Sequence, residues 1–374
     1  MALMAWRSDV SGLASMYSSQ DIRIVHLEIT TKCNAACPMC LRTVCGGEVN
    51  PQLPLVELSL GDIKKIFYPE FVRQLDKVFM CGNYGDPVVA KDTLEAFKYF
   101  KEQNPKIKLS MFSNASARPA SWWQELAQTV QEVHFAVDGL ADTNHLYRRN
   151  TNFEIIMRNA KAYIDAGGKA IWDYIVFRHN EHQVEEAQEL AKNMGFKKIN
   201  IKKTGRFFSN TRSEVKAQQE VLNTKGEIEY YLEMPLAPQY LNNALKKEEE
   251  LVARYGHLEK YLDKASIACK VDLEKSLYVS AEGHVFPCCW TANQLYPWYF
   301  KPRSSQVWNL INQLEHQEKS ISALHQPIET IINGPFFKKI EESWSLPSVN
   351  MGKLKPCAKT CGKDFDPFRA QFTN

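Results

Sequence analysis

The strongest constraint on this chain is a repeated alternation of short β-rich runs and amphipathic helical stretches between about residues 22 and 206. The predicted strands are Ile24–Ile29, Lys77–Met80, Ile107–Phe112, Glu132–Val137, Ala170–Phe177 and Lys198–Lys203. The helical stretches include Thr93–Gln103, Ser121–Gln131, Phe153–Ala166 and Glu181–Met194, the last ending on an expected left-handed cap at Gly195. Six strands alternating with helices predict a parallel α/β sheet with right-handed crossovers, either an open doubly wound sheet or a barrel. Both architectures bind ligands at the carboxyl ends of the strands.

Composition divides the chain into three predicted parts. Residues 22–210 contain the strand–helix alternation. Residues 211–264 are rich in Glu, Lys, Gln, Leu and Ala, which favours a helical connector. Residues 265–374 show fewer helical signals and hold five of the ten cysteines, so we expect a smaller second domain there.

The overall composition fits a soluble globular protein, with 44% apolar and 24% charged residues. The net charge of +3 is too small to predict binding to nucleic acid or membranes. The chain lacks the roughly 18-residue apolar run that spans a bilayer and a basic, then apolar, N-terminal leader, so we expect a cytoplasmic protein. In such a protein, clustered cysteines indicate metal binding or redox chemistry rather than disulfides.

Three cysteines follow the first predicted strand, at Cys33, Cys37 and Cys40. This spacing could place the thiols on one face of a buried helix, but Pro38 opposes a helix here. A loop around a metal centre fits better. Zinc usually takes four protein ligands, and Cys45 is the only local candidate for a fourth. Three thiolates on a short loop suit an iron–sulfur cubane with one iron left open.

This segment resembles the radical S-adenosylmethionine (radical SAM) enzymes, whose CxxxCxφC motif follows the first strand of a partial (β/α)6 TIM-like barrel. The match places Met39 in the φ position, where the family more often has an aromatic residue. The resemblance implies a 4Fe-4S cluster on Cys33, Cys37 and Cys40, with SAM chelating the fourth iron. It also implies reductive cleavage of SAM to a 5′-deoxyadenosyl radical.

The ends of the next strands also resemble the family. Segment 81–87 resembles its GGEP motif with Asp in place of Glu, 113–115 its Thr-Asn-Gly turn, 137–139 its Ser-x-Asp-Gly, and 144–148 its HxxYR segment, one residue short. The SAM-binding residues that this implies are Met39, Tyr84, Gly85, Asp86, Pro87, Ser113, Asn114, Asp138 and Arg148. Each segment also has an ordinary alternative, such as a turn at 82–87, a helix cap at Asp138 or a surface charge at Arg148.

Two further features lie on the last predicted strands. Asp173 either faces the barrel interior and touches substrate or lies at a solvated strand edge. The cations of segment 202–206 either hold an acidic substrate group or form a solvated strand end. No catalytic general base is predicted.

A second set of cysteines lies near the C-terminus. Cys269, Gly283 and Cys288 frame an alternating pattern that predicts a β-hairpin, and Cys357 and Cys361 form a CxxxC pair. The pattern resembles the SPASM/twitch domains that hold auxiliary iron–sulfur clusters, here in the one-cluster twitch form with an α+β fold.

By this resemblance Cys269, Cys288, Cys357 and Cys361 are the ligands of a second 4Fe-4S cluster. Cys289 could replace a neighbour or be a small buried thiol, whereas Cys45 and Cys81 are not expected to bind metal. A structural zinc site is the alternative for this cluster.

The preferred hypothesis is a radical SAM enzyme that takes a hydrogen atom from a substrate at the barrel mouth, with net oxidation assisted by the auxiliary cluster. Its expected partners are a peptide or small-molecule substrate and an electron donor such as flavodoxin or ferredoxin. The first alternative is a redox-neutral rearrangement or the modification of a nucleic-acid base, which the low net charge disfavours. The second is a zinc-stabilised interaction protein without catalysis.

Overall fold

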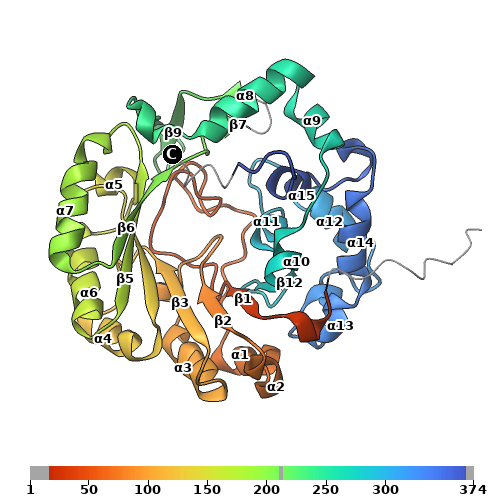
Figure 1. Cartoon of the computed structure of the whole chain (residues 1–374), viewed down its shortest axis with the longest axis horizontal. Helices are drawn as coiled ribbons and strands as arrows, with labels where there is room; N and C mark the ends of the chain where they lie inside the picture. The colour runs from red at the N-terminus through yellow and green to blue at the C-terminus, as the bar shows by residue number, and fades with distance from the viewer. Residues whose placement is uncertain (1–16, 210–213, 368–374) are drawn as a thin grey trace, which may run out of the picture.

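The computed structural model describes residues 17–209 and 214–367. Its centre is a curved sheet of eight strands in the order β12-β11-β1-β2-β3-β4-β5-β6, which Figure 1 shows as an incomplete ring. Strands β1 to β6 pair in parallel. Their bounds are β1 Ile24–Leu27, β2 Lys77–Met80, β3 Lys108–Ser113, β4 Glu132–Ala136, β5 Lys169–Val176 and β6 Lys198–Lys203. The predicted partial (β/α)6 barrel is confirmed, and no predicted strand end is wrong by more than two residues.

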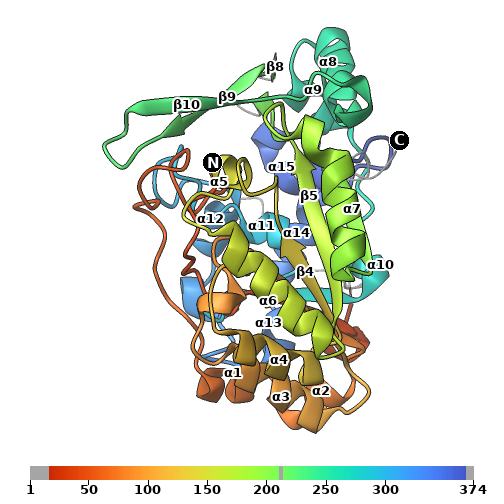
Figure 2. The ribbon, with the colours of Figure 1, turned by 90° about the vertical axis from the view of Figure 1, so that its left-hand side faces the viewer.

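Helices cover the outer face of this sheet, as Figures 1 and 2 show. They are α1 Leu60–Ile66, α2 Pro69–Arg73, α3 Thr93–Gln103, α4 Ala120–Thr129, α6 Phe153–Asp165 and α7 Val184–Met194, with the short α5 Asn144–Tyr147 near the carboxyl ends of the strands. Helix α7 ends at Gly195, whose φ of 91° confirms the predicted left-handed cap.

The strands bury one face against these helices and leave the other face half-buried. Val25 and Leu27 of β1 are completely buried, whereas His26 between them keeps some exposure. Val78 and Met80 of β2 repeat the pattern. This two-residue period explains why the segments form strands, since alternate apolar side chains pack against the helix layer.

The prediction of a helical connector is wrong for its first half. Strands β9 Gln218–Leu222 and β10 Ile228–Glu233 form an antiparallel hairpin there, and helices begin only with α8 Asn243–Tyr255 and α9 Leu258–Lys264. Val221 and Leu232 are buried between exposed neighbours, and Gly226 adopts a φ of 80° in the turn. Alternation and a glycine turn are hairpin signals that the Glu- and Lys-rich composition obscured. The start of the predicted connector, residues 211–213, lies outside the described residues.

The hairpin β9–β10 extends as an arm above α5 in Figure 2. It is attached to the loop after β1, because Leu222 N donates to the Cys45 carbonyl at 2.9 Å. It is also attached to the segment around α5, through a 2.7 Å ion pair between Arg149 and Glu229 and a bond from Tyr230 Oη to the Leu146 carbonyl. The hairpin therefore covers part of the barrel end at which the strands terminate.

The C-terminal part begins with α10 Lys270–Glu274 and the strands β11 Ser276–Val279 and β12 Val285–Phe286. The two strands form the predicted hairpin, with Gly283 in its turn at a φ of 74°. Strand β11 also pairs in parallel with β1, so the barrel sheet continues across the boundary predicted at residue 265. The helices that follow are α11 Cys289–Ala292, α12 Gln306–Ile311, α13 Ile328–Ile332, α14 Pro335–Trp344 and α15 Lys355–Thr360. Within the described residues, every helix is too short or too polar to traverse a lipid bilayer.

Candidate active site

The three N-terminal thiols lie on an irregular loop after β1 rather than on a helix. Cys40 N donates to the Cys37 carbonyl at 3.0 Å, which closes a tight turn with Pro38 at its second position. Proline is favoured there because its fixed φ suits the turn. Thr43 fastens the turn by donating its hydroxyl to the Cys37 carbonyl at 3.1 Å. Pro38 thus marks a loop, as the sequence predicted.

Nitrogen donors face two of the three sulfur atoms of this loop. Ala35 N lies 3.3 Å from Cys33 Sγ, Asn114 Nδ2 lies 3.7 Å from the same atom, and Arg148 Nη1 lies 3.8 Å from Cys37 Sγ. Burial raises the pKa of the Cys37 thiol to about 11, although Arg148 opposes this rise. Metal binding would deprotonate such thiols, and the donors would then stabilise the thiolates.

Among residues 17–209 and 214–367, no three His, Cys, Asp or Glu side chains converge on a position for a single metal ion. A cubane has a different requirement, because each thiolate binds its own iron and the sulfur atoms stand farther apart. The donor set of three thiols on one loop, two of them faced by nitrogen donors, fits such a cluster. Cys45 stays apart from it, since its Sγ accepts a hydrogen bond from Gln219 of the hairpin at 3.4 Å.

The loop after β2 is held against the loop after β1 by a buried acid. Glu28 Oε1 accepts from Tyr84 N at 2.7 Å and from Gly85 N at 3.0 Å, while Oε2 accepts from the Tyr278 hydroxyl. Burial raises the pKa of Glu28 to about 7 despite these donors. A Cβ on Gly85 would stand 1.8 Å from the Thr30 carbonyl oxygen, so only glycine fits this approach.

Asp86 connects the loop after β2 to the end of β3. Its buried carboxylate accepts from Ser113 Oγ at 2.8 Å, from Asn114 N at 2.7 Å and from Val88 N at 3.0 Å. Pro87 begins the short 3-10 helix that Asp86 caps. The predicted site residues at these two strand ends are therefore brought together. Asp86 acts as a brace between them, and its contact with SAM stays a prediction.

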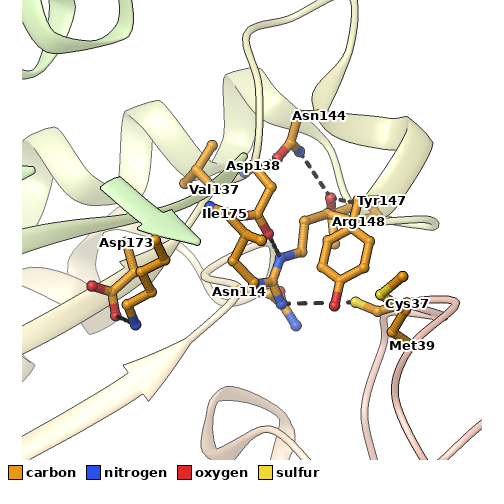
Figure 3. A network of polar contacts seen from close by, with 12 residues as sticks. Cys37, Met39, Asn114, Val137, Asp138, Asn144, Tyr147, Arg148, Asp173 and Ile175 are labelled. Carbon is orange, nitrogen blue, oxygen red and sulfur yellow. Dashed lines mark hydrogen bonds and ion pairs between the residues drawn. The ribbon is translucent and has the colours of Figure 1, made fainter. Parts of the chain in front are cut away.

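Asp138 and Arg148 form a buried ion pair at the end of β4, as Figure 3 shows. Arg148 Nε lies 2.6 Å from Asp138 Oδ2, and Asp138 Oδ1 accepts from Ile175 N at 2.5 Å. Asp138 is completely buried. The sequence predicted separate contacts of these two residues with SAM, whereas the structure shows the carboxylate holding the guanidinium beside Cys37. The alternative of a surface charge at Arg148 is wrong.

Arg206, after β6, reaches the same loop. Its Nη1 donates to the Met39 carbonyl at 3.1 Å and to the Tyr147 hydroxyl at 3.2 Å. Asp173 is buried and contacts Lys202 at 2.7 Å, so neither residue lies at a solvated strand end. Although burial raises the pKa of Asp173, its neighbours lower it to about 2.

The four C-terminal cysteines predicted as ligands line one cavity. They come from four places, since Cys269 and Cys288 precede α10 and α11, Cys357 lies in α15 and Cys361 follows it. The other lining residues are mostly apolar: Ile267, Val271, Pro287, Trp290, Thr291, Ile340, Trp344, Pro356 and Thr360. A cavity with four thiols and apolar walls fits a fully ligated cluster. The thiol count alone fits zinc equally.

The thiols of this cavity interact with one another. A hydrogen bond from Cys269 lowers the pKa of Cys361 to about 7 and raises that of Cys269. Burial raises the pKa of Cys357, while the N–H of Trp344 opposes this rise. Apart from the Cys357 thiol that it faces, the buried Trp344 Nε1 has no hydrogen-bond partner within the described residues. An indole N–H can only donate, so it suits a cavity whose acceptors are thiolates.

Cys289 does not line the cavity. Burial raises the pKa of its thiol, and the negative charges of Cys288, Cys81 and Glu28 add to this rise. It therefore lies on the barrel side of Cys288, near Cys81 after β2. This placement favours a buried thiol over a ligand at Cys289, and the ligand set itself stays a prediction.

Comparison with known families decides the class of the barrel. Residues 27–194, from the end of β1 to the end of α7, match the family model described as the radical SAM superfamily. The chain carries a radical SAM domain. Members of this superfamily are enzymes that use a 4Fe-4S cluster and SAM. No curated protein matches the sequence.

Solved structures share the fold of this radical SAM domain and its C-terminal extension. Streptococcus suis SuiB is 13% identical, with a TM-score of 0.51 over 86% of this chain and 68% of SuiB. Histidine-tagged anSMEcpe with bound AdoMet is 13% identical, with a TM-score of 0.52 over 94% of this chain and 92% of that protein. Native anSMEcpe with AdoMet and the Cp18Cys peptide has a TM-score of 0.50, at 13% identity, over 93% and 95%.

Sequence reasoning missed two residues of the radical SAM domain and its extension. Glu28 follows the first strand directly, and an acid at the end of an apolar strand was the available signal. Trp344 gave no such signal, because nothing in its sequence context connects it to a cysteine 13 residues away. Arg206 was predicted only as one of several cations near the mouth.

Proposed function

We propose that the chain is a radical SAM enzyme that abstracts a hydrogen atom from a substrate and completes a net oxidation with an auxiliary 4Fe-4S cluster. When bound and reduced, the first cluster would supply the electron that cleaves SAM to a 5′-deoxyadenosyl radical. The observation that carries the proposal is the loop of Cys33, Cys37 and Cys40, in which the first two thiols face nitrogen donors while Cys45 is directed to the hairpin. Such a loop leaves one iron for SAM.

The strand ends supply groups that match the polar parts of SAM. Arg148 is held beside Cys37 by Asp138 and would pair with the SAM carboxylate in the forked geometry of guanidinium. Asn114 lies beside Cys33. Glu28 engages the N–H groups of Tyr84 and Gly85, and carbonyl groups of this loop would accept from the SAM amino group. We further propose Met39, Asp86, Pro87, Ser113 and Asp138 as the rest of the SAM site, several of them through the braces described above.

The second cluster would be held by Cys269, Cys288, Cys357 and Cys361 in a twitch-type domain. Because four thiolates leave no iron for substrate, its role would be to accept an electron from the substrate radical. A flavodoxin or ferredoxin would reduce the first cluster. Fold similarity to anSMEcpe, which was solved with a peptide, supports a peptide substrate over a nucleic acid.

The test is SAM cleavage by the anaerobically reconstituted protein with dithionite. We expect about eight irons per chain and formation of 5′-deoxyadenosine. The variant Cys37→Ala should lose this product and about half of the iron, because the second set of thiols stays intact. The matched control Cys45→Ala should keep both.

Two results would overturn the proposal. Undiminished cleavage by Cys37→Ala would contradict the role of the loop. A colourless protein that contains zinc and no iron would instead support the alternative of a zinc-stabilised interaction protein.

A further inference from the structure

Several large side chains on the interior face of the barrel keep partial exposure. In a closed eight-stranded barrel, layers of large residues occupy the interior. Here the outward residues Val133 and Phe135 of β4 are completely buried, whereas the inward residue His134 between them keeps some exposure. Phe79 of β2 and Phe112 of β3 keep exposure in the same way. Large side chains that retain contact with solvent inside a barrel leave room for a ligand.

These inward residues form a continuous row of rings, here called the aromatic belt: Tyr278, His26, Phe79, Phe112 and His134. Each comes from a different strand, in the order β11, β1, β2, β3 and β4. Neighbouring ring centroids lie 4.9, 4.4, 6.3 and 4.1 Å apart. The His26–Phe79 and Phe112–His134 pairs are stacked, with interplanar angles of 26° and 19°. Positive ring edges favour the negative face of another ring, so a belt of this kind suits a planar ligand.

The belt lies close to the first thiol loop. Two residues beyond Phe112, on the same face of the chain, Asn114 donates to Cys33 Sγ at 3.7 Å. Two strand residues correspond to about 7 Å. A ring on the belt would therefore lie just beneath the position where the substrate radical would form under the proposed function.

His26 gives the belt one unused acceptor. Its Nε2 lies 2.5 Å from the Cys81 carbonyl oxygen, which can only accept, so Nε2 carries the hydrogen. Burial lowers the pKa of His26 to about 4, which leaves the ring neutral at pH 7. Nδ1 is then an acceptor, and no described residue donates to it. The other histidine of the belt has both nitrogens engaged, with Asp173 and Glu132.

On the β5–β6 side of the barrel interior, the charge of Asp173 is already compensated by its neighbours. Asp173 accepts from Asn200 at 2.7 Å on one oxygen and contacts Lys202 at 2.7 Å with the other. This buried ion pair bounds the belt on the β5–β6 side. Lys77 Nζ also lies over the Phe79 ring, 5.3 Å from its centroid, so this part of the belt already holds a cation, and the apolar rings around it favour an uncharged ligand ring over a second cation.

We propose that the aromatic belt binds an uncharged planar ring of the substrate that bears an O–H or N–H group, as in a tyrosine or tryptophan side chain, and that this group donates to His26 Nδ1. The inference rests on the proposed function for its consequence, since the bound ring would be the part of the substrate nearest the radical. The claim that the belt binds such a ring depends only on the geometry of the belt.

The test is equilibrium dialysis of the reconstituted protein, with SAM, against capped amides. N-acetyl-tyrosinamide and N-acetyl-tryptophanamide represent the two ring types, N-acetyl-phenylalaninamide lacks the donor, and N-acetyl-leucinamide lacks the ring. We expect both donor-bearing rings to be retained more strongly than the leucine probe. The variant His26→Phe should weaken binding of the tyrosine probe about fivefold and leave the phenylalanine probe unchanged, since it removes one hydrogen bond but keeps the ring.

A second variant keeps the inference testable if His26→Phe does not fold. Phe79→Leu should weaken all three aromatic probes and leave the leucine probe unchanged, with iron content and circular dichroism as checks of folding. Equal retention of the leucine and tyrosine probes, or no retention of any ring, would overturn the inference. Formation of 5′-deoxyadenosine is measured separately, so failure of the belt and failure of SAM cleavage are distinguishable.

Discussion

The two groups of cysteines occupy opposite chemical environments. The thiols at residues 33–40 lie at strand ends among polar groups, including the Asn114 amide and the Arg148 guanidinium. The thiols around Cys357 line a cavity whose other walls are mainly apolar, with Ile340 and Trp344 among them. Polar groups can exchange partners with a zwitterionic ligand, whereas apolar walls exclude one. Under the proposed function, the first site would bind a cofactor and the second would hold its cluster apart from solvent.

The largest effect should come from removing one thiol of the apolar cavity. We expect Cys357→Ala to lose the second cluster, and hence about half of the iron, because the iron left without a thiolate would face mainly apolar walls, with no cofactor such as SAM to complete its coordination. Reductive cleavage of SAM with dithionite as the electron donor should continue, since the first cysteine loop is unchanged. Iron analysis and 5′-deoxyadenosine formation measure the two outcomes.

The matched control for this variant is Cys289→Ala. Cys289 is adjacent in sequence to Cys288 but lies outside the cavity, so the variant should keep the full iron content. If it loses the second cluster while Cys357→Ala retains it, the ligand set proposed here is wrong.

The sequence predicted most of the barrel because each signal was local. The bounds of the strands follow from the alternation of apolar and polar residues. The end of helix α7 follows from Gly195, because glycine adopts the left-handed backbone conformation without steric strain. The hairpin β9–β10 was missed because segment 211–264 was read by composition, although Val221 and Leu232 carried the alternating pattern. The pairing of β11 with β1 joins residues about 250 positions apart, which no local pattern can predict.

The sequence predicted candidate site residues one by one, but not the contacts that connect them. The strand-end residues were identified individually by resemblance, yet the structure shows Asp86 bracing two strand ends and Asp138 holding Arg148. Such connections depend on where side chains meet in space. A residue far from the motifs, such as Trp344, becomes visible only when the cavity is seen.

The contribution of the Asp138–Arg148 ion pair should be measurable in the free energy of unfolding of the protein. Asp138→Asn removes the charge that pairs with Arg148, and a buried guanidinium left without its partner costs about 3 to 5 kcal/mol of unfolding free energy. We also expect weaker SAM binding, because the guanidinium is no longer held beside Cys37. Denaturant unfolding and equilibrium SAM binding are the measurements, and the iron of the second cluster should not change.

A surface ion pair of the neighbouring arginine provides the control. Arg149 contacts Glu229 at 2.7 Å, and the glutamate side chain is 47% exposed. Glu229→Gln should cost less than about 1 kcal/mol and leave SAM binding unchanged, as exposed pairs contribute little. Equal losses from the two variants would show that burial of the Asp138 pair has no special role.

The smallest effect should come from one hydrogen-bond donor in the apolar cavity. Trp344 Nε1 is buried, faces the Cys357 thiol and has no other partner among the described residues. A donor to a cluster thiolate favours the more negative, reduced state and so raises the potential. Trp344→Phe should therefore lower the potential of the second cluster by about 40 mV, the equivalent of about 1 kcal/mol for one electron, and leave the first unchanged.

A redox titration followed by electron paramagnetic resonance separates this effect from a general loss of packing. Trp308 is the control, because its Nε1 donates to the Leu295 carbonyl at 2.8 Å and it does not line the cavity. Trp308→Phe should lower stability without moving either potential. If the potential of the second cluster stays constant in Trp344→Phe, the indole is only part of the apolar wall, and the cavity controls its cluster by excluding water alone.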